Sequence, residues 1–445
     1  EIYSQFDQKD SVEQSSRCSQ CGIPYCQIHC PLNNNIPDWL RYIAEGRLEE
    51  AYQVSASTNA FPEVCGRVCP QDRLCEGNCV VEQAGFGAIT IGNLEKYLTE
   101  IAWKNGWVKN LSSKNKFNQK VAIIGSGPAG MAASAYLAQN GYQVDVFEKN
   151  DRAGGLMIYG IPNFKLDKNI VERRTEWLQE SGVKFNLNTE VGKNISFQDL
   201  EKDYDAILIA TGVYKARKLD IDTSSVVNSI PALDFLIESN RTGLGDSPSE
   251  NKFLNAKNKN VVVIGGGDTA MDCVRTAIRQ QAKEVTCLYR RNKENMPGSA
   301  REVLNAEQEG IKFNWLSVPS KIISEDYTAT SMTYKVAALG EVDESGRRKP
   351  VDTGVEKQIK SDLIIQALGF EPEDLNHNFK TNIELTSWKT VKVDFKKFQT
   401  SNPKIFAAGD IVRGASLVVW AIHDGREVAK SIHNFLQNSK IKKAS

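Results

Sequence analysis

The chain has 445 residues, which is long enough for about three domains. Its 55 basic and 55 acidic residues balance, so the composition predicts no basic surface for nucleic acid or for an anionic membrane. Hydrophobic residues make up 41%, and no apolar run approaches the roughly 18 residues that a membrane span needs. We therefore expect a globular protein of the cytoplasm that binds neither nucleic acid nor a membrane.

Cysteines are concentrated at the start of the chain. Eight of the ten lie in two groups within the first fifth: Cys18, Cys21, Cys26 and Cys30, then Cys65, Cys69, Cys75 and Cys79. Disulfides are typical of small secreted domains, whereas this chain is long. The C-x2-C step at 18–21 would suit zinc. The first group, C-x2-C-x4-C-x3-C-P, is close to the spacing of bacterial ferredoxins, so we favour iron–sulfur clusters and keep zinc open.

Helices are expected between and after the two cysteine groups. Apolar residues recur at helical spacing over 36–46, where an asparagine can cap the start and a glycine can end the helix. Helical spacing continues over 48–54, and a third helix is expected over 90–103. The polar, aperiodic stretch 109–118 is interpreted as a linker. Residues 1–118 are therefore predicted to form a small α-helical domain.

A strand, a glycine-rich loop and a helix follow this domain. The strand 120–124 leads into a G-x-G-x-x-G loop that contains Gly125, Gly127, Pro128, Ala129 and Gly130. In such a loop the first glycine makes a tight turn, the second lets the backbone approach a pyrophosphate, and the third lets helix pack on strand. The next strand, 143–147, ends at Glu148, where an acid accepts the hydroxyls of a ribose.

The same pattern returns 140 residues later. The strand 260–264 leads into a G-x-G-x-x-A loop that contains Gly265, Gly267, Asp268, Thr269 and Ala270. The following strand, 284–289, ends at Arg290 and Arg291 instead of an acid. A carboxylate there would repel a 2′-phosphate, whereas guanidinium groups bind it bidentately. We therefore expect NADPH rather than NADH at this second loop.

Further segments fit a flavin domain that resumes near the C-terminus. Strands over 205–210 and 362–368 run into glycines, as is usual for the crossings between two nucleotide domains. A strand that begins at 404 delivers an Ala-Gly-Asp step near a helix start, which suits contact with the ribityl or phosphate end of a flavin. A helix cap is the alternative role for the aspartate. From these segments we place at the flavin Thr211, Gly212, Gly409, Asp410 and Val418.

Two dinucleotide folds behind a cysteine-rich domain indicate an electron path. NADPH gives up two electrons at once as a hydride, whereas iron–sulfur clusters accept one at a time. A flavin can accept two electrons and release them singly, so it belongs between them. Zinc has no redox role and would leave the flavin without an outlet. A disulfide outlet is poorly supported, because Cys273 and Cys287 are 14 residues apart rather than in a C-x-x-C motif.

Taken together, the motifs resemble those of one family. They are the cysteine block, the loops GSGPAG and GGGDTAMD, the segments GGLMIYGIPNFKL and YRR, the Met296-Pro297 step, and AAGD followed by AIHDGR. The set is similar to that of the flavoproteins that include the small (beta) subunit of NADPH-dependent glutamate synthase and the N-terminal half of dihydropyrimidine dehydrogenase. The resemblance covers nearly the whole chain, and it adds Gly155 and Leu156 to the residues expected at the cofactor.

The resemblance implies FAD, NADPH and two [4Fe-4S] clusters. One cluster would be held by Cys18, Cys21, Cys26 and Cys79. The other would be held by Cys30, Cys69, Cys75 and, as the non-cysteine ligand, Glu95. A surface position on its helix is the alternative for this glutamate, and Cys65 would be structural. No residue of the chain would be catalytic, because the flavin carries the chemistry.

The resemblance also implies a partner. In glutamate synthase a large (alpha) subunit with FMN receives the electrons and forms L-glutamate from glutamine and 2-oxoglutarate, so we expect a hetero-oligomer. The same machinery could instead serve a ferredoxin:NADP oxidoreductase or a transhydrogenase. A zinc-stabilised nucleotide-binding scaffold without turnover is a third hypothesis, from a different class.

The expected fold is therefore α/β, with two Rossmann-like dinucleotide-binding domains preceded by an α-helical iron–sulfur domain. We predict two clusters in residues 1–118, FAD in 119–216 and 368–445, and NADPH in 217–367. Within the last of these, the charged stretch 338–360 is expected to form a hairpin that turns at 344–347.

Overall fold

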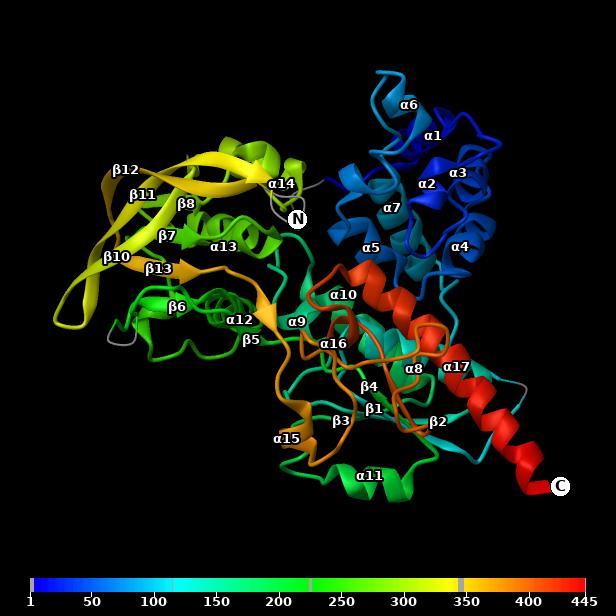
Figure 1. The fold of residues 1–445 in the computed structure, drawn as a ribbon. Coiled ribbons are helices and arrows are strands. Elements are labelled where there is room, and N and C mark those ends of the chain that lie inside the picture. The colour runs from blue at the N-terminus through cyan, green and yellow to red at the C-terminus, as the bar shows by residue number, and fades with distance from the viewer. Residues whose placement is uncertain (1–3, 114, 224–225, 343–347, 445) are drawn as a thin grey trace. The chain divides into compact units, whose positions relative to one another are not determined.

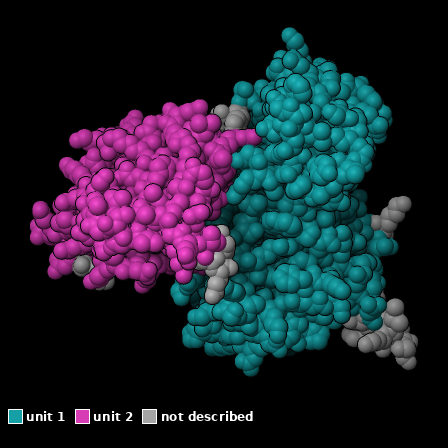
Figure 2. All heavy atoms as spheres, turned by 45° about the horizontal axis from the view of Figure 1, so that its top comes forward, with its two compact units in different colours: residues 1–158, 164–215, 371–445 teal, residues 159–163, 216–370 magenta. Residues whose placement is uncertain are grey.

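The computed structural model describes residues 4–113, 115–223, 226–342 and 348–444 (Figure 1). The chain divides into two compact units (Figure 2). Unit 1 comprises residues 1–158, 164–215 and 371–445, and unit 2 comprises residues 159–163 and 216–370. Within the described part of the chain, no helix has the length and apolar character needed to cross a membrane.

Unit 1 begins with a helical region. Its helices are α1 (Gln8–Ser16), α2 (Tyr25–Ile28), α3 (Ile36–Ala44), α4 (Leu48–Ala56), α5 (Pro62–Val68), η1 (Gln71–Arg73), α6 (Val80–Gln83) and α7 (Ile91–Lys104). The three helices predicted from apolar spacing are confirmed as α3, α4 and α7. Trp39, Leu40 and Ile43 of α3 and Leu94 and Leu98 of α7 are buried in one hydrophobic core.

A parallel sheet forms the rest of unit 1. Its strands are β1 (Lys120–Ile124), β2 (Gln143–Phe147), β3 (Lys184–Asn186), β4 (Ala206–Ile209) and β15 (Ile405–Ala407), in the order β15-β4-β1-β2-β3. Every neighbouring pair is parallel. The apolar runs of β1 and β4 are buried, as is typical of parallel strands covered on both faces. The order lets a strand from the end of the chain complete the sheet, as the sequence predicted.

Helices pack on this sheet and connect its strands. They are α8 (Pro128–Asn140), α9 (Leu156–Tyr159), α10 (Lys168–Glu180), α11 (Phe197–Asp203), α15 (Leu375–Phe379), α16 (Asp410–Arg413) and α17 (Val418–Ala444). The long helix α17 runs alongside α8 (Figure 1). A Cβ on Gly425 of α17 would lie 2.4 Å from the carbonyl oxygen of Ala129, so this glycine permits the close approach of the two helices.

Unit 2 contains a second parallel sheet. Its strands are β6 (Ser229–Pro231), β7 (Asn260–Ile264), β8 (Glu284–Tyr289), β9 (Lys312–Trp315) and β13 (Leu363–Gln366), in the order β6-β13-β7-β8-β9. Its helices are α12 (Ala232–Gly243), η2 (Lys252–Leu254), α13 (Asp268–Arg279), η3 (Lys293–Asn295) and α14 (Ala300–Gln308). The two glycine loops of the sequence thus begin α8 and α13, one in each unit.

An antiparallel sheet completes unit 2. It consists of β10 (Ser317–Glu325), β11 (Thr328–Val342) and β12 (Arg348–Lys360). Strands β11 and β12 pair from Ser331 with Lys360 to Val342 with Arg348, which confirms the predicted hairpin strands. The predicted turn at 344–347 lies outside the described residues. Two short strands, β5 (Lys215–Ala216) and β14 (Phe370–Glu371), pair where the chain passes from one unit to the other.

Candidate cofactor sites

The first glycine loop joins β1 to α8. Gly125 has φ +100°, and a Cβ there would lie 2.5 Å from the carbonyl oxygen of Ala210, at the end of β4. A Cβ on Gly130 would lie 2.1 Å from the carbonyl oxygen of Gly125 itself. Both positions therefore require glycine, the first for the turn and the second for the contact of helix with loop.

The carboxyl ends of four parallel strands bring the predicted flavin residues to one edge of the sheet. The glycine loop follows β1, Glu148 follows β2, Thr211 and Gly212 follow β4, and Gly409 follows β15. Open α/β sheets bind their ligands at such an edge. The fold thus gathers residues that lie up to 284 positions apart in the sequence.

The residues at this edge fit a flavin dinucleotide. No side chain caps the N-terminus of α8, and a Cβ on Gly127 would meet no atom within 4 Å, so backbone donors face open space. A Cβ on Gly155 would lie 2.8 Å from the Cα of Gly127, which places the Gly155–Leu156 step against the loop. The hydroxyl of Thr211 is buried and has no hydrogen-bond partner in the described structure.

Glu148 has a role that sequence reasoning missed. One carboxylate oxygen accepts hydrogen bonds from the backbone N–H of Ser126 (3.1 Å) and from its hydroxyl (2.6 Å). The other oxygen accepts from the backbone and side-chain amides of Asn150, at 2.9 and 2.8 Å. Four donors therefore use the acceptor positions of this buried carboxylate. Glu148 anchors the glycine loop, and a ribose hydroxyl would have to replace one of these donors.

Asp410 is the first residue of α16 and lies behind Gly409. Burial raises the pKa of its carboxyl to about 6, although a hydrogen bond from the backbone N–H of Ser416 opposes the shift. Gly409 occupies the N-cap of α16 without a side-chain hydrogen bond, whereas the Asp410 carboxylate accepts the backbone N–H of Ser416, two residues before α17. The flavin contact and the capping role of Asp410 therefore both stay predictions. Val418 follows as the first residue of α17.

The second glycine loop repeats the geometry of the first in unit 2. A Cβ on Gly265, whose φ is +145°, would lie 2.2 Å from the carbonyl oxygen of Ala367, at the end of β13. The N-terminus of α13 has no side-chain cap, and a Cβ on Gly267 would meet no atom within 4 Å. Thr269 and Ala270 lie in the first turn of α13. This cradle fits a second dinucleotide.

A neighbouring segment supports that loop, and the sequence had not indicated it. The backbone N–H of Gly298 donates to the carbonyl of Gly266 at 2.9 Å. The backbone N–H of Ser299 donates to the Asp268 carboxylate at 2.9 Å. The Met296-Pro297 step before these two residues belongs to the family resemblance, but the sequence assigned no role to Gly298 or Ser299.

The two arginines after β8 have different surroundings. Arg290 is exposed directly after the strand. Arg291 is buried at 5% exposure, and its Nε donates to the carbonyl of Arg348 at 2.8 Å. The structure therefore leaves Arg290 as the more accessible of the two for a 2′-phosphate.

The first four predicted cluster ligands lie close together. Burial raises the pKa of the Cys26 thiol to about 12, and the nearby Cys18, Cys79 and Cys21 contribute to the shift. Burial also raises the pKa of Cys18, with contributions from Cys21 and Cys79. Cys79 comes from the start of α6, so the fold joins it to the first cysteine group. Bound iron would supply the positive charge that such thiolates need.

A cavity lies at the second predicted set. Its lining includes Cys30, Cys69, Cys75 and Glu95, together with Cys65 and Val419. Glycines let the ligand-bearing helices approach, because a Cβ on Gly66 of α5 would lie 2.7 Å from the carbonyl oxygen of Gly92 in α7. The cavity therefore collects sulfur donors and one carboxylate from loops and helices that are distant in the sequence, a donor set that fits an iron–sulfur cluster.

Cys65 and Glu95 both belong to this cavity. Cys65, predicted to be structural, lines the cavity beside Cys69, whose pKa is raised by a hydrogen bond with Cys65 and by burial. Burial raises the pKa of Glu95, and the side-chain amide of Asn59 donates to it at 3.3 Å. None of the ten cysteines forms a disulfide. Among the described residues, no three His, Cys, Asp or Glu side chains converge as the ligands of a single metal ion do.

Comparison with known families defines the class of the protein. Residues 1–107 match the family described as dihydropyrimidine dehydrogenase domain II, 4Fe-4S cluster, and residues 119–425 match the pyridine nucleotide-disulphide oxidoreductases. FprA from Mycobacterium tuberculosis, solved in complex with NADPH, shares the fold: the TM-score is 0.61 at 19% identity, over 74% of this chain and 86% of that one. The chain is thus a pyridine nucleotide oxidoreductase that carries an N-terminal iron–sulfur domain.

Closer relatives identify the family within that class. The glutamate synthase [NADPH] small chain of Azospirillum brasilense is 53% identical over 98% of this chain and 91% of its own length. The corresponding small chain of Escherichia coli K12 is 45% identical over 98% and 94%. The chain belongs to the family of NADPH-dependent glutamate synthase small chains. The predicted fold class and enzyme class are confirmed, and the 4Fe-4S family match decides for iron–sulfur clusters over zinc.

Proposed function

We propose that this chain is the electron-input subunit of a glutamate synthase. Electrons would pass from NADPH to FAD, to two [4Fe-4S] clusters, and to an FMN-containing large (alpha) subunit that forms L-glutamate from glutamine and 2-oxoglutarate. The full-length similarity to two small chains supports this assignment. The observation that carries it is the second cavity, where sulfur ligands and Val419 of α17 line the same space. When bound, the flavin supplies the conversion of a two-electron donor to one-electron acceptors.

Each nucleotide has a proposed unit. The loop Gly265–Ala270 and Arg290 in residues 217–367 would hold NADPH, with Arg291 packed behind. The first loop, Gly155–Leu156 and the residues after β4 and β15 would hold FAD in 119–216 and 368–445. Uncapped helix N-termini offer backbone donors to both pyrophosphates.

The two cluster sites have a proposed order. Because Val419 lines the second cavity and Val418 is a proposed flavin contact, the cluster of Cys30, Cys69, Cys75 and Glu95 would receive electrons first. The other cysteines lie beside exposed apolar residues: Ile23, Tyr25 and Ile28 are between 48% and 62% exposed. No charged residue occurs from 18 to 37, so this face suits the large subunit as the next acceptor.

Anaerobic purification tests the proposal. We expect a brown protein with roughly eight iron atoms and matching inorganic sulfide per chain, and bleaching of its colour by NADPH. Addition of the large subunit should produce NADPH oxidation that depends on glutamine. A holoprotein without inorganic sulfide would refute the assignment, whereas reduction of a ferredoxin without any large subunit would favour another acceptor. The cytoplasmic location expected from the sequence stays a prediction.

A further inference from the structure

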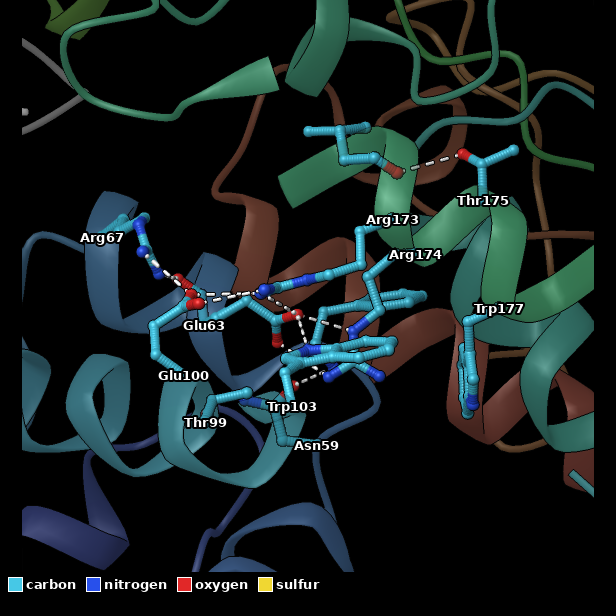
Figure 3. A network of polar contacts seen from close by, with 12 residues as sticks. Asn59, Glu63, Arg67, Thr99, Glu100, Trp103, Arg173, Arg174, Thr175 and Trp177 are labelled. Atoms are coloured by element: carbon cyan, nitrogen blue, oxygen red, sulfur yellow. Dashed lines mark hydrogen bonds and ion pairs between the residues drawn. The ribbon is translucent and has the colours of Figure 1, made fainter. Parts of the chain in front are cut away.

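A buried network of charges connects α10 to the helices of the second cluster site (Figure 3). Arg174 of α10 donates two hydrogen bonds to the Glu63 carboxylate of α5, from Nε at 2.7 Å and from Nη2 at 2.8 Å. Arg173 likewise donates two hydrogen bonds to the Glu100 carboxylate of α7, from Nη1 at 2.9 Å and from Nη2 at 3.0 Å. Arg67 of α5 also bonds Glu100, at 3.0 Å, so one network spans three helices.

The Glu63–Arg174 pair at the centre of the network is enclosed, whereas Arg173 and Glu100 are partly exposed. The Glu63 side chain is 0% exposed and that of Arg174 is 2% exposed. The Trp103 indole N–H donates to Glu63 at 3.2 Å, and the same ring stacks under both guanidinium groups, 4.6 Å from Arg173 and 4.9 Å from Arg174. Bidentate, stacked arginines fix both distance and orientation, which lysines at the same positions would not do.

The three helices carry parts of two proposed cofactor sites. Helix α5 contains Cys65 and leads into Cys69, and α7 contains Glu95. At its other end, α10 supports the flavin side, because Lys168 Nζ donates to the carbonyl of Met157 at 3.0 Å. A Cβ on Gly154 would lie 2.5 Å from Val171 of α10, so the Gly154–Gly155 step rests directly on this helix. Helix α10 thus contacts the flavin loop through Lys168 and Val171, and the cluster helices through Arg173 and Arg174, which follow within one turn of Val171.

We propose that Arg173 and Arg174 are positioning residues that fix the second cluster relative to the flavin, and so set the rate of electron transfer between them. The inference rests on the proposed function, because it concerns the step from FAD to cluster. The rate of transfer between two bound groups depends steeply on their distance and orientation. A small shift of α5 and α7 against α10 would therefore slow electron transfer from the flavin to the second cluster. Helices α5 and α7 do not contribute to either proposed nucleotide site, so a shift of these two helices should leave hydride transfer from NADPH to the flavin nearly unchanged.

The principal variant is Arg173→Gln, which removes the two-point contact with Glu100 and a 3.5 Å ion pair with Glu63 but keeps the two hydrogen bonds between Arg174 and Glu63. Its matched control is Arg279→Gln in unit 2, where Arg279 makes a similar two-point contact with Glu309, at 2.8 and 3.0 Å. Arg173→Lys keeps the positive charge but cannot make the two-point contact of a guanidinium group with Glu100. The double variant Glu63→Gln/Arg174→Met removes the buried pair without leaving an unpaired charge.

Anaerobic stopped-flow of the flavin- and iron-loaded proteins separates the two steps. We expect Arg173→Gln to slow cluster reduction about tenfold or more, while NADPH reduces the flavin within about twofold of the wild-type rate. The double variant should slow the cluster step at least as much, Arg173→Lys should be intermediate, and Arg279→Gln should leave both steps unchanged. Hydrogen exchange, which needs no turnover, should show faster exchange in α5 and α7 for Arg173→Gln but not for Arg279→Gln.

The outcomes distinguish this inference from the function on which it rests. Wild-type cluster reduction and wild-type hydrogen exchange in both Arg173→Gln and the double variant would overturn the positioning role. Full rescue by Arg173→Lys would show that charge alone matters, and would also overturn it. If NADPH fails to reduce the clusters in the wild-type protein itself, the proposed electron path is wrong, and hydrogen exchange still tests whether the arginines hold the helices.

Discussion

At the residue scale, the surroundings of each arginine decide what its guanidinium can do. Arg174 is enclosed and paired with Glu63, so it joins two parts of unit 1. Arg291 is buried against the carbonyl of Arg348 and stabilises unit 2. Arg290, one position earlier, is exposed after β8. These two arginines, adjacent in the bend after β8, therefore differ in exposure and in the groups they can contact.

Arg290→Glu tests the coenzyme preference. The added carboxylate would repel a 2′-phosphate, so we expect the KM for NADPH to rise roughly 10- to 100-fold, while that for NADH changes by less than about threefold. Steady-state kinetics with both coenzymes would measure this. Lys283→Glu, an exposed cation at the opposite end of β8, is the control and should affect neither. An equal loss for the two coenzymes would contradict a role at the 2′-phosphate.

Asp410 predicts a pH dependence of stability. Its pKa is raised to about 6, above the value near 3.9 of an unfolded chain, so its stabilising contribution is complete below about pH 4 and is lost as the pH rises through 6. At about 1.4 kcal/mol per pKa unit, the loss amounts to at most about 3 kcal/mol. Asp410→Asn removes this dependence. Urea unfolding of the flavin-free protein should therefore show the variant gaining stability relative to wild type between pH 4.5 and pH 7. A difference in the free energy of unfolding between variant and wild type that stays constant with pH would show that the pKa of Asp410 is not raised.

At the element scale, features set by a local sequence pattern could be predicted, whereas features set by packing between distant segments could not. The glycine loops, their strands and the cysteine groups were predictable because each is a short motif with a fixed physical meaning. Helix α10 has no such motif, and its partners lie 73 and 111 positions away. The support of the second loop by Ser299 and the place of Cys65 in the cavity likewise depend on contacts between distant segments. Sequence periodicity carries no information on such pairings.

The crossing of α5 and α7 depends on Gly66. A methyl group there would press on the carbonyl of Gly92 and on the backbone N–H of Lys96, 3.0 Å away, and would separate the helices. For Gly66→Ala we expect a destabilisation of about 1–3 kcal/mol and a fall in iron from roughly eight to roughly four atoms per chain. Iron and sulfide analysis would measure this loss.

The matched control is Gly22→Ala. Gly22 lies next to Cys21, but a Cβ there would meet no atom within 4 Å, so its iron content should stay unchanged. Full iron content in Gly66→Ala would contradict this expectation, because it would show that the second cluster still binds when α5 and α7 are further apart. Loss of iron in both variants would point to general fragility of the helical region.

At the scale of the whole molecule, unit 2 is an insertion in unit 1. The chain enters through β5 and leaves through β14, and these strands pair. The backbone N–H of Arg217 donates to the carbonyl of Gly369 at 3.1 Å, so the two ends of the insertion are neighbours. Unit 1 keeps its own sheet, whose last strand, β15, comes from beyond the insertion.

Removal of the insertion tests this organisation. We expect a chain in which a short Gly-Ser linker replaces residues 217–369 to retain FAD and roughly eight iron atoms, because the residues proposed to hold FAD and the clusters lie in unit 1. Dithionite should bleach it, whereas NADPH should not. Flavin absorbance and iron analysis beside the full chain would check the result. Failure to retain flavin would show that unit 1 does not fold without the insertion.

The adjacency of those two ends has a consequence for the origin of such enzymes. A segment whose termini meet can be replaced as a cassette without disturbing the host around it. Under the proposed function, the coenzyme bound by unit 2 could then change independently of the cofactors bound by unit 1. An NADH-selective domain inserted between β5 and β14 would then change the coenzyme preference and leave the proposed flavin and cluster sites of unit 1 unaltered.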